Sequence, residues 1–128
     1  PVMGHIGFTP QHYNKFRLGG SLKRDRSKLL NEAKKNEKAG VFSIVVECVT
    51  NTAAKEITQS LKIPTIGIGA SIHCDGQILV TDDMLGLSGF YPKFVKKFVK
   101  LNNIIEKGVQ KYNKAVLTKK FPSKENTF

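Results

Sequence analysis

The apolar run at residues 41–46 constrains the fold more than any other segment. Its residues, Val-Phe-Ser-Ile-Val-Val, are mostly β-branched or aromatic, a pattern typical of a parallel strand buried on both faces. A second apolar segment, 65–70, begins 23 residues after Phe42. That length accommodates a right-handed crossover through a helix. The sequence therefore predicts an α/β protein with a parallel sheet.

The remaining elements alternate in the same way along the chain. We expect strands at 1–7 and 77–80, and helices at 28–39, 51–61, 82–86, 92–99 and 102–117. Ser27 and either Asn51 or Thr52 are the expected N-caps of the first two helices, and Gly40 the expected C-terminal cap. The long segment 8–25 is expected to be a binding loop or lid, and the tail 121–128 to be loose until docked. This βα rhythm permits either a doubly wound sheet or a barrel.

Charge and composition limit the classes of partner. The 128 residues carry 21 Lys and Arg against 10 Asp and Glu, for a net charge of +11. The basic residues are spread along the chain, so we expect a lysine-rich surface rather than a nucleic-acid site. No apolar run approaches the roughly 20 residues that span a bilayer. Two cysteines exclude a disulfide-dense secreted scaffold, and we expect a cytoplasmic protein with reduced thiols and no membrane partner.

Glu47 and His5 are the candidate catalytic and binding residues. Glu47 directly follows the apolar run at 41–46, and His5 lies at the end of the expected first strand. Parallel strands bring their carboxyl ends to one surface, where ligands of α/β folds bind. Burial beside Val46 and Val49 would disfavour the charged carboxylate and suit it to act as a general base. The structural alternatives are an ion pair of Glu47 with a Lys or Arg, and a histidine that caps a strand end.

Three other motifs suggest structural rather than catalytic roles. The segment 67–70, Gly-Ile-Gly-Ala, lacks the third glycine of a dinucleotide fingerprint, so it favours close backbone packing or approach to a small ligand. His73, Cys74 and Asp75 are consecutive and point in different directions, which disfavours a metal site. Cys48 could be a nucleophile, but no histidine is near it in sequence, and we expect a buried, inert thiol.

Four segments together resemble one enzyme family. They are residues 1–11, with His5-Ile6-Gly7-Phe8-Thr9-Pro10, residues 45–49, with Glu47-Cys48-Val49, and residues 63–70 and 74–80. In this order they resemble ketopantoate hydroxymethyltransferase over nearly the whole chain, and the segments 92–96 and 121–122 fit as well. The resemblance implies a TIM (β/α)8 barrel of the phosphoenolpyruvate/pyruvate type, assembled as a homo-oligomer.

The family's reaction would place this chain in pantothenate and coenzyme A biosynthesis. The resemblance implies transfer of a one-carbon unit from 5,10-methylenetetrahydrofolate to 3-methyl-2-oxobutanoate, a keto acid, which gives ketopantoate. It implies Glu47 as the general base and His5 as a residue that lines the substrate site. It also implies a Mg²⁺ ion that holds the keto acid and stabilises the enolate.

The resemblance further implies that residues 1–128 are the C-terminal half of a single barrel domain, covering about strands five to eight plus the C-terminal helices. The family's Mg²⁺ ligands and substrate lysine would lie in the other half, so no metal ligand is expected in this chain. Four strands leave open edges and a bare inner face, and we expect the chain alone to be inactive. The alternative is an inactive half-barrel fragment or a basic interaction or nucleic-acid-binding module.

Overall fold

The computed structural model describes residues 1–10 and 17–128. The chain forms two compact units, Pro1–Leu79 and Val80–Phe128. The first unit contains β1 (Met3–Gly7), α1 (Lys23–Lys38), β2 (Ser43–Glu47), α2 (Asn51–Ser60), β3 (Thr65–Ile68) and β4 (Gly76–Gln77). The second contains α3 (Thr81–Leu85), α4 (Leu101–Leu117) and the 3₁₀ turn η1 (Lys124–Asn126).

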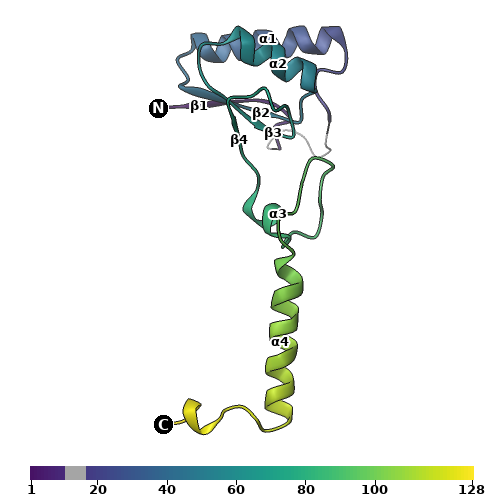
Figure 1. The fold of residues 1–128 in the computed structure, drawn as a ribbon. Helices are drawn as coiled ribbons and strands as arrows, with labels where there is room; N and C mark the ends of the chain where they lie inside the picture. The colour runs from purple at the N-terminus through teal and green to yellow at the C-terminus, as the bar shows by residue number, and fades with distance from the viewer. Residues whose placement is uncertain (11–16) are drawn as a thin grey trace. The chain divides into compact units, whose positions relative to one another are not determined.

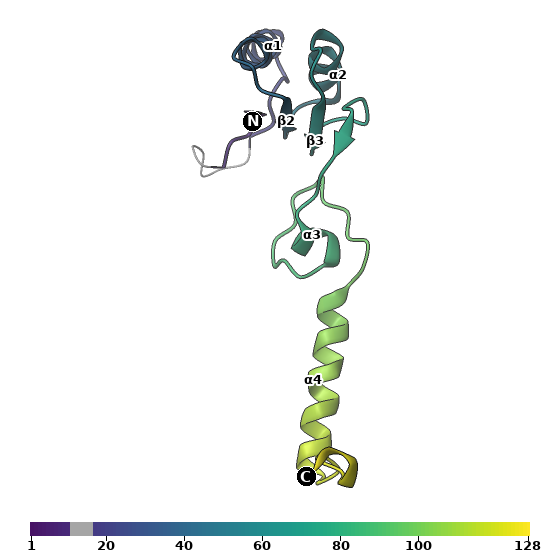
Figure 2. The ribbon, with the colours of Figure 1, turned by 90° about the vertical axis from the view of Figure 1, so that its left-hand side faces the viewer.

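The first unit is a parallel sheet covered by helices on one face. Its strand order is β1-β2-β3-β4, and every neighbouring pair is parallel. Figure 1 shows α1 and α2 together on the same side of the sheet, and Figure 2 shows both helices above β2 and β3. The predicted α/β class is confirmed. A doubly wound sheet has helices on both faces, so the sequential order and one-sided cover favour the barrel alternative.

The hydrophobic core lies between the sheet and these two helices. Ile6, Ile44 and Val46 project from the covered face of the sheet, and Ala33 of α1 and Ile57 of α2 pack against them. Every buried hydrophobic side chain of residues 1–10 and 17–128 belongs to the first unit. The apolar side chains of α1 and α2, which recur at the helical period, therefore face the sheet.

The opposite face of the sheet has no helix over it in the first unit. Side chains alternate between the faces of a strand, so Val45 and Glu47 project from the face opposite Ile44 and Val46. Val45 and Glu47 are only partly buried, whereas Ile44 and Val46 are fully buried. The expectation that residues 41–46 are buried on both faces is therefore met only in part, since Val41 and Ser43 are buried but Val45 is partly exposed and Phe42 is exposed.

Several boundaries also differ from those expected. Helix α1 begins at Lys23 rather than at 28, and the Ser27 hydroxyl donates to the Lys23 carbonyl inside the helix instead of capping it. Thr50, not Asn51 or Thr52, precedes α2, and its hydroxyl donates to the Gly20 carbonyl. The first turn of α1 is charged and exposed, so no apolar period marks its start. Residues 11–16 of the expected loop 8–25 lie outside the described residues.

The largest error concerns the segment 92–99, which forms no helix. A single turn bond links the Val95 amide to the Pro92 carbonyl, and the Phe98 amide donates to the Met84 carbonyl in α3. Strand β4 is also shorter than expected, because only Gly76 and Gln77 pair with β3. The tail 121–128 is more ordered than expected, since Ser123 forms a capping box at the start of η1.

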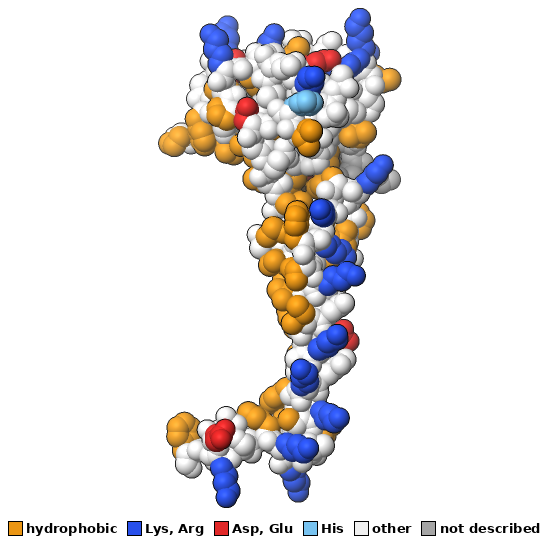
Figure 3. All heavy atoms as spheres, viewed as in Figure 1, with side chains coloured by type: hydrophobic (Ala, Val, Ile, Leu, Met, Phe, Trp, Pro, Cys, Tyr) orange, Lys and Arg blue, Asp and Glu red, His pale blue; other side chains and the backbone are white. Residues whose placement is uncertain are grey.

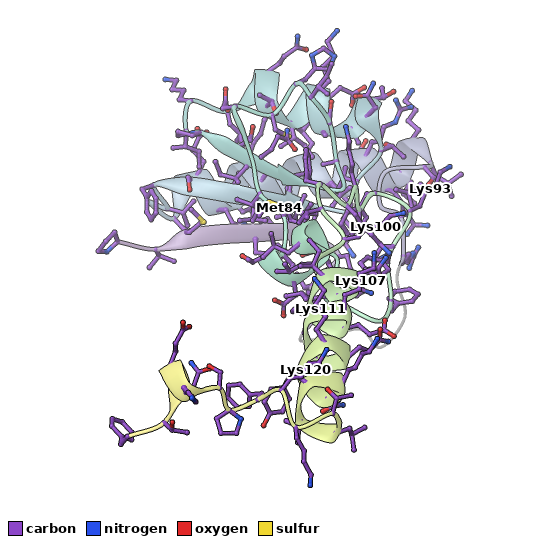
Figure 4. All side chains as sticks on the ribbon, turned by 60° about the horizontal axis from the view of Figure 1, so that its bottom comes forward. Met84, Lys93, Lys100, Lys107, Lys111 and Lys120 are labelled. Carbon is purple, nitrogen blue, oxygen red and sulfur yellow. The ribbon has the colours of Figure 1, made fainter. Side chains whose placement is uncertain are left out.

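Helix α4 is amphipathic. Leu101, Ile105, Tyr112 and Val116 follow one another at helical spacing, and Lys107, Lys111 and Lys114 do so on a different side. Ile105, Tyr112 and Val116 are exposed in this chain, although Tyr112 makes an edge contact with Phe121. Figure 3 shows hydrophobic and lysine side chains side by side on the second unit, and Figure 4 labels Lys107 and Lys111 along α4.

Candidate functional site

Glu47 and His5 lie together on the uncovered face of the sheet. The register pairs His5 with Val45 and Gly7 with Glu47, so the two side chains are diagonal neighbours on adjacent strands. Diagonal neighbours lie within reach of long side chains. The His5 Nε2 atom is 3.0 Å from Glu47 Oε2. The roles of donor and acceptor depend on the tautomer of His5; toward an ionised carboxylate, which carries no proton, the imidazole N–H is the donor.

Gly7 allows the backbones of β1 and β2 to approach closely at the end of the pair. It stands directly opposite Glu47 in the β1–β2 register and has φ +93°. A Cβ atom at this position would lie 2.0 Å from the Glu47 carbonyl oxygen and 2.8 Å from the Val49 side chain. Only glycine therefore fits at this position, and this role of Gly7 was not foreseen from the sequence.

The pair is partly shielded from water. The Glu47 side chain is 13% exposed and the His5 side chain 31% exposed. Among the described residues, Glu47 has its only ion pair with His5 and none with a lysine or arginine. Its Oε2 atom is the one that contacts His5, and its Oε1 atom accepts no hydrogen bond from residues 1–10 or 17–128.

Cys48 has the character of a structural thiol. Its side chain is buried, and burial, followed by the neighbouring Glu47 charge, raises the pKa of the thiol to about 11. A thiol with this pKa is protonated at neutral pH, and the thiolate is the nucleophilic form. The nucleophile alternative for Cys48 is therefore disfavoured. Cys74, the second free cysteine, is also buried.

Asp75 serves the fold rather than a metal. Its Oδ2 atom accepts from the Thr65 amide at 2.8 Å and from the Thr65 hydroxyl at 3.0 Å. These two bonds, the amide first, lower the pKa of the Asp75 carboxyl. Residues 1–10 and 17–128 contain no group of three His, Cys, Asp or Glu side chains that could hold a metal ion.

The glycines at 67 and 69 are also used by the fold. A Cβ atom on Gly67 would lie 2.9 Å from the Gln77 side chain and 3.2 Å from the Cys74 sulfur. Gly69 has φ +59°, the left-handed region that favours glycine. Of the two readings of segment 67–70, the structure shows close packing.

A small cavity lies at the carboxyl end of β1. Its volume is about 130 Å³. Gly7 and Phe8 border it on one side, and Asp25, Lys28 and Glu32 of α1 on another. The Lys28 ammonium lies 3.9 Å from the Glu32 carboxylate, so charges of both signs line it. Neither His5 nor Glu47 does.

The fold and this site define a class of protein. A parallel sheet in sequential order, with helices on one face and a carboxylate and an imidazole near the carboxyl ends of adjacent strands, is typical of enzymes built on (β/α)8 barrels. The family model described as ketopantoate hydroxymethyltransferase matches residues 1–124. The chain belongs to this family, which confirms the resemblance seen in the sequence.

Individual relatives agree with the family match. The chain is 48% identical over 128 residues to the 3-methyl-2-oxobutanoate hydroxymethyltransferase of Pelagibacter ubique and 51% identical over 132 residues to that of Thermosipho africanus. The match to the relative from Sulfurisphaera tokodaii is 48% over 129 residues. The first two matches cover the whole chain and half of each relative, and the third covers 98% of the chain and 48% of the relative. The chain thus spans about half the length of the curated relatives it matches.

The comparisons also distinguish between the two functional interpretations of the chain, a transferase and a basic nucleic-acid-binding module. They support the transferase reading and give no support to a basic nucleic-acid-binding module. Among the helices that the structure describes, none has the length and apolarity needed to cross a membrane. The surface lysines of the second unit, labelled in Figure 4, therefore belong to a member of an enzyme family.

Proposed function

We propose that the protein containing this chain transfers a hydroxymethyl group from 5,10-methylenetetrahydrofolate to 3-methyl-2-oxobutanoate. The observation that carries the proposal is the Glu47–His5 contact of 3.0 Å on the open face of the sheet, in a chain whose relatives are named for this reaction. The product is ketopantoate, the precursor of pantothenate. Residues 1–128 would contribute the C-terminal half of one barrel domain.

Glu47 is proposed as the general base. Its carboxylate would take a proton from C3 of the keto acid, the carbon beside the keto group, and leave an enolate. Water would add to the methylene carbon of the folate, and both carbon–nitrogen bonds of that carbon would break, each nitrogen taking up a proton, to release tetrahydrofolate and a formaldehyde unit. The enolate carbon would then bond to the carbon of this unit, and its oxygen would take up a proton to become the hydroxyl group. The partial burial of Glu47 and its contact with His5 support this role.

His5 is proposed to bind the substrate and to hold Glu47 in place. Its Nε2 atom lies 3.0 Å from the carboxylate, and this contact would orient the base toward the uncovered face. The other ring nitrogen, Nδ1, is then left to face a ligand, either as an acceptor or, when protonated, as a donor. A keto acid carries a carboxylate and a keto oxygen that both accept hydrogen bonds, so a protonated imidazole would suit it.

The cofactors and partners are part of the same proposal. The described residues do not form a three-ligand cluster, so they do not fit a Mg²⁺ site by themselves, and we derive no step through the metal. We keep the expectation that Mg²⁺ ligands come from outside this chain. Folate as one-carbon donor, assembly as a homo-oligomer and a cytoplasmic location are likewise proposed from family membership.

The test uses the natural protein, expressed from its complete gene. Glu47→Gln should lower kcat by at least about 100-fold, the usual contribution of a general base. The same variant should slow exchange of the C3 proton of the keto acid in deuterium oxide, a step that needs no folate. Glu56→Gln, which removes an exposed carboxylate of α2 paired with Arg26, is the matched control and should leave both rates within about twofold.

Two outcomes would contradict the proposal. Exchange at an unchanged rate in a folded Glu47→Gln variant would remove Glu47 from the role of base. No turnover by the natural protein with the keto acid, folate and Mg²⁺ would favour the alternative of an inactive relative of these enzymes.

A further inference from the structure

The chain turns sharply immediately after Glu47. Cys48 has φ +50°, which lies in the left-handed region. Residues with a side chain rarely adopt this conformation, because the Cβ atom approaches the following carbonyl group. Such outliers persist only where the surrounding structure holds them, and they gather at functional sites. Contacts from the surrounding structure must therefore hold Cys48 in this left-handed conformation.

Three separate segments hold this turn. The Glu47 carbonyl accepts from the Phe8 amide at 2.9 Å, just after β1. The Cys48 amide donates to the Ile68 carbonyl at 3.0 Å, at the end of β3, and the Cys48 carbonyl accepts from the Gly19 amide at 2.8 Å. Both peptide groups on either side of the Cys48 Cα atom are thus tied to neighbours. The backbone that carries Glu47 is fixed from β1, from β3 and from the loop before α1.

The turn also fixes the backbone that follows Glu47. Glu47 is the last residue of β2, and strand alternation places its side chain on the open face and Cys48 toward the covered one, where Cys48 is 6% exposed. The left-handed φ of Cys48 bends the chain at this point, so the peptide group after Glu47 keeps its bonds to Phe8 and Ile68. Gly7, opposite Glu47, adds a second positive φ at the same level of the sheet.

We propose that Cys48 is a positioning residue for Glu47, and that it acts through its left-handed backbone rather than through its thiol. Only the expected effect of residue 48 on turnover rests on the proposed function. The structural statement is that the His5–Glu47 distance depends on the conformation at residue 48. It concerns a residue that does not touch the substrate.

Three substitutions in the natural protein separate the backbone from the thiol. Cys48→Ala removes the sulfur and leaves a side chain with the same backbone preference. Cys48→Gly removes the sulfur and adopts a positive φ freely. Cys48→Val introduces a β-branched side chain, for which a positive φ is a genuine outlier.

We expect the alanine and glycine variants to keep the His5–Glu47 distance near 3.0 Å in their crystal structures and kcat within about threefold. The valine variant should separate the two side chains beyond hydrogen-bond distance. It should also lower kcat and the C3 proton exchange rate together by at least about tenfold, with KM for the keto acid within about threefold. Lower stability alone would not reduce kcat and the exchange rate while leaving KM for the keto acid unchanged.

The inference is overturned if the valine variant keeps the contact and the kcat, or if the alanine variant loses them, since the latter result would make the thiol itself important. If the valine variant does not fold, the alanine and glycine pair decides. Glycine should then unfold at the higher temperature, and the reverse order would overturn the inference. Because the distance is read without turnover, a failure of the proposed reaction remains distinguishable from a failure of this inference.

Discussion

At the scale of single residues, two carboxylates show how context assigns a role. Glu47 and Asp75 both lie near strand ends of the same sheet. Asp75 accepts two hydrogen bonds from Thr65 through one oxygen, whereas Glu47 is held only by His5 among the described residues. The first carboxylate is committed to the fold, whereas the second contacts a single side chain of the part of the chain that the structure describes.

Asp75 should make stability depend on pH in the acidic range. Its pKa is lowered from the ordinary 3.8 by the Thr65 bonds, so its contribution is present above that value and is lost as the pH falls through the lower pKa of the folded state. Asp75→Asn should flatten the fall of the thermal midpoint below pH 4. The check is a series of melting curves from pH 7 to pH 2. Equal slopes for wild type and variant would contradict the assignment.

The candidate site was partly predictable from single residues. Glu47 and His5 were found because each was expected at the end of an apolar strand, and parallel strands end at one surface, although His5 lies within β1 and Glu47 is the last residue of β2. The sequence could not reveal that Gly7 must be glycine opposite Glu47, since that depends on the register of β1 against β2. It also could not reveal the positive φ of Cys48, because nothing in the local composition marks a left-handed cysteine.

At the scale of elements, the apolar period correctly predicted α2 and α4 but also predicted a helix at 92–99 that does not form. The period of Ala53, Ala54 and Ile57 correctly placed α2 against the core. The segment 92–99 has a similar alternation of lysine with Phe and Val, yet its backbone bonds go to Met84 and to a single turn. A two-turn helix without a core to face is not stable on propensity alone, so tertiary contacts decided its form.

Two glycines of the second unit should respond to alanine in opposite directions. Gly108 lies inside α4 with open space around its Cβ position, so Gly108→Ala should raise stability by about 1 kcal/mol. Gly86 ends α3 at φ +76°, and a Cβ there would meet the Val99 carbonyl oxygen at 2.6 Å. Gly86→Ala should lower stability by about 1 kcal/mol or more. Urea unfolding of both variants is the measurement, and a shared sign would refute this account.

At the scale of the whole molecule, the buried apolar residues are unevenly distributed. All of those in residues 1–10 and 17–128 lie in Pro1–Leu79. The composition indicated enough apolar residues for a core, but it could not show that those of α4 would be exposed. Whether the apolar side chains of a helix are buried depends on what the helix packs against, and a single sequence does not contain that information.

Truncating an isoleucine in each unit should therefore have unequal effects on this 128-residue chain. Ile57 is 1% exposed in α2, so Ile57→Ala should destabilise it by about 3 kcal/mol. Ile105 is 50% exposed in α4, and Ile105→Ala should change stability by less than about 0.5 kcal/mol. Chemical denaturation measures both. Comparable losses would mean that α4 is covered in solution.

The diagonal placement of Glu47 and His5 also sets a length requirement on the acid itself. The distance between the two strands is spanned by the imidazole of His5 from β1 and the glutamate from β2, and each must be long enough to reach the other. An aspartate is shorter by one methylene, about 1.5 Å, and would stop short of the imidazole of His5 while keeping the same charge. Two acids that are interchangeable on most protein surfaces are therefore not equivalent here, and the identity of residue 47 is dictated by reach as much as by acidity.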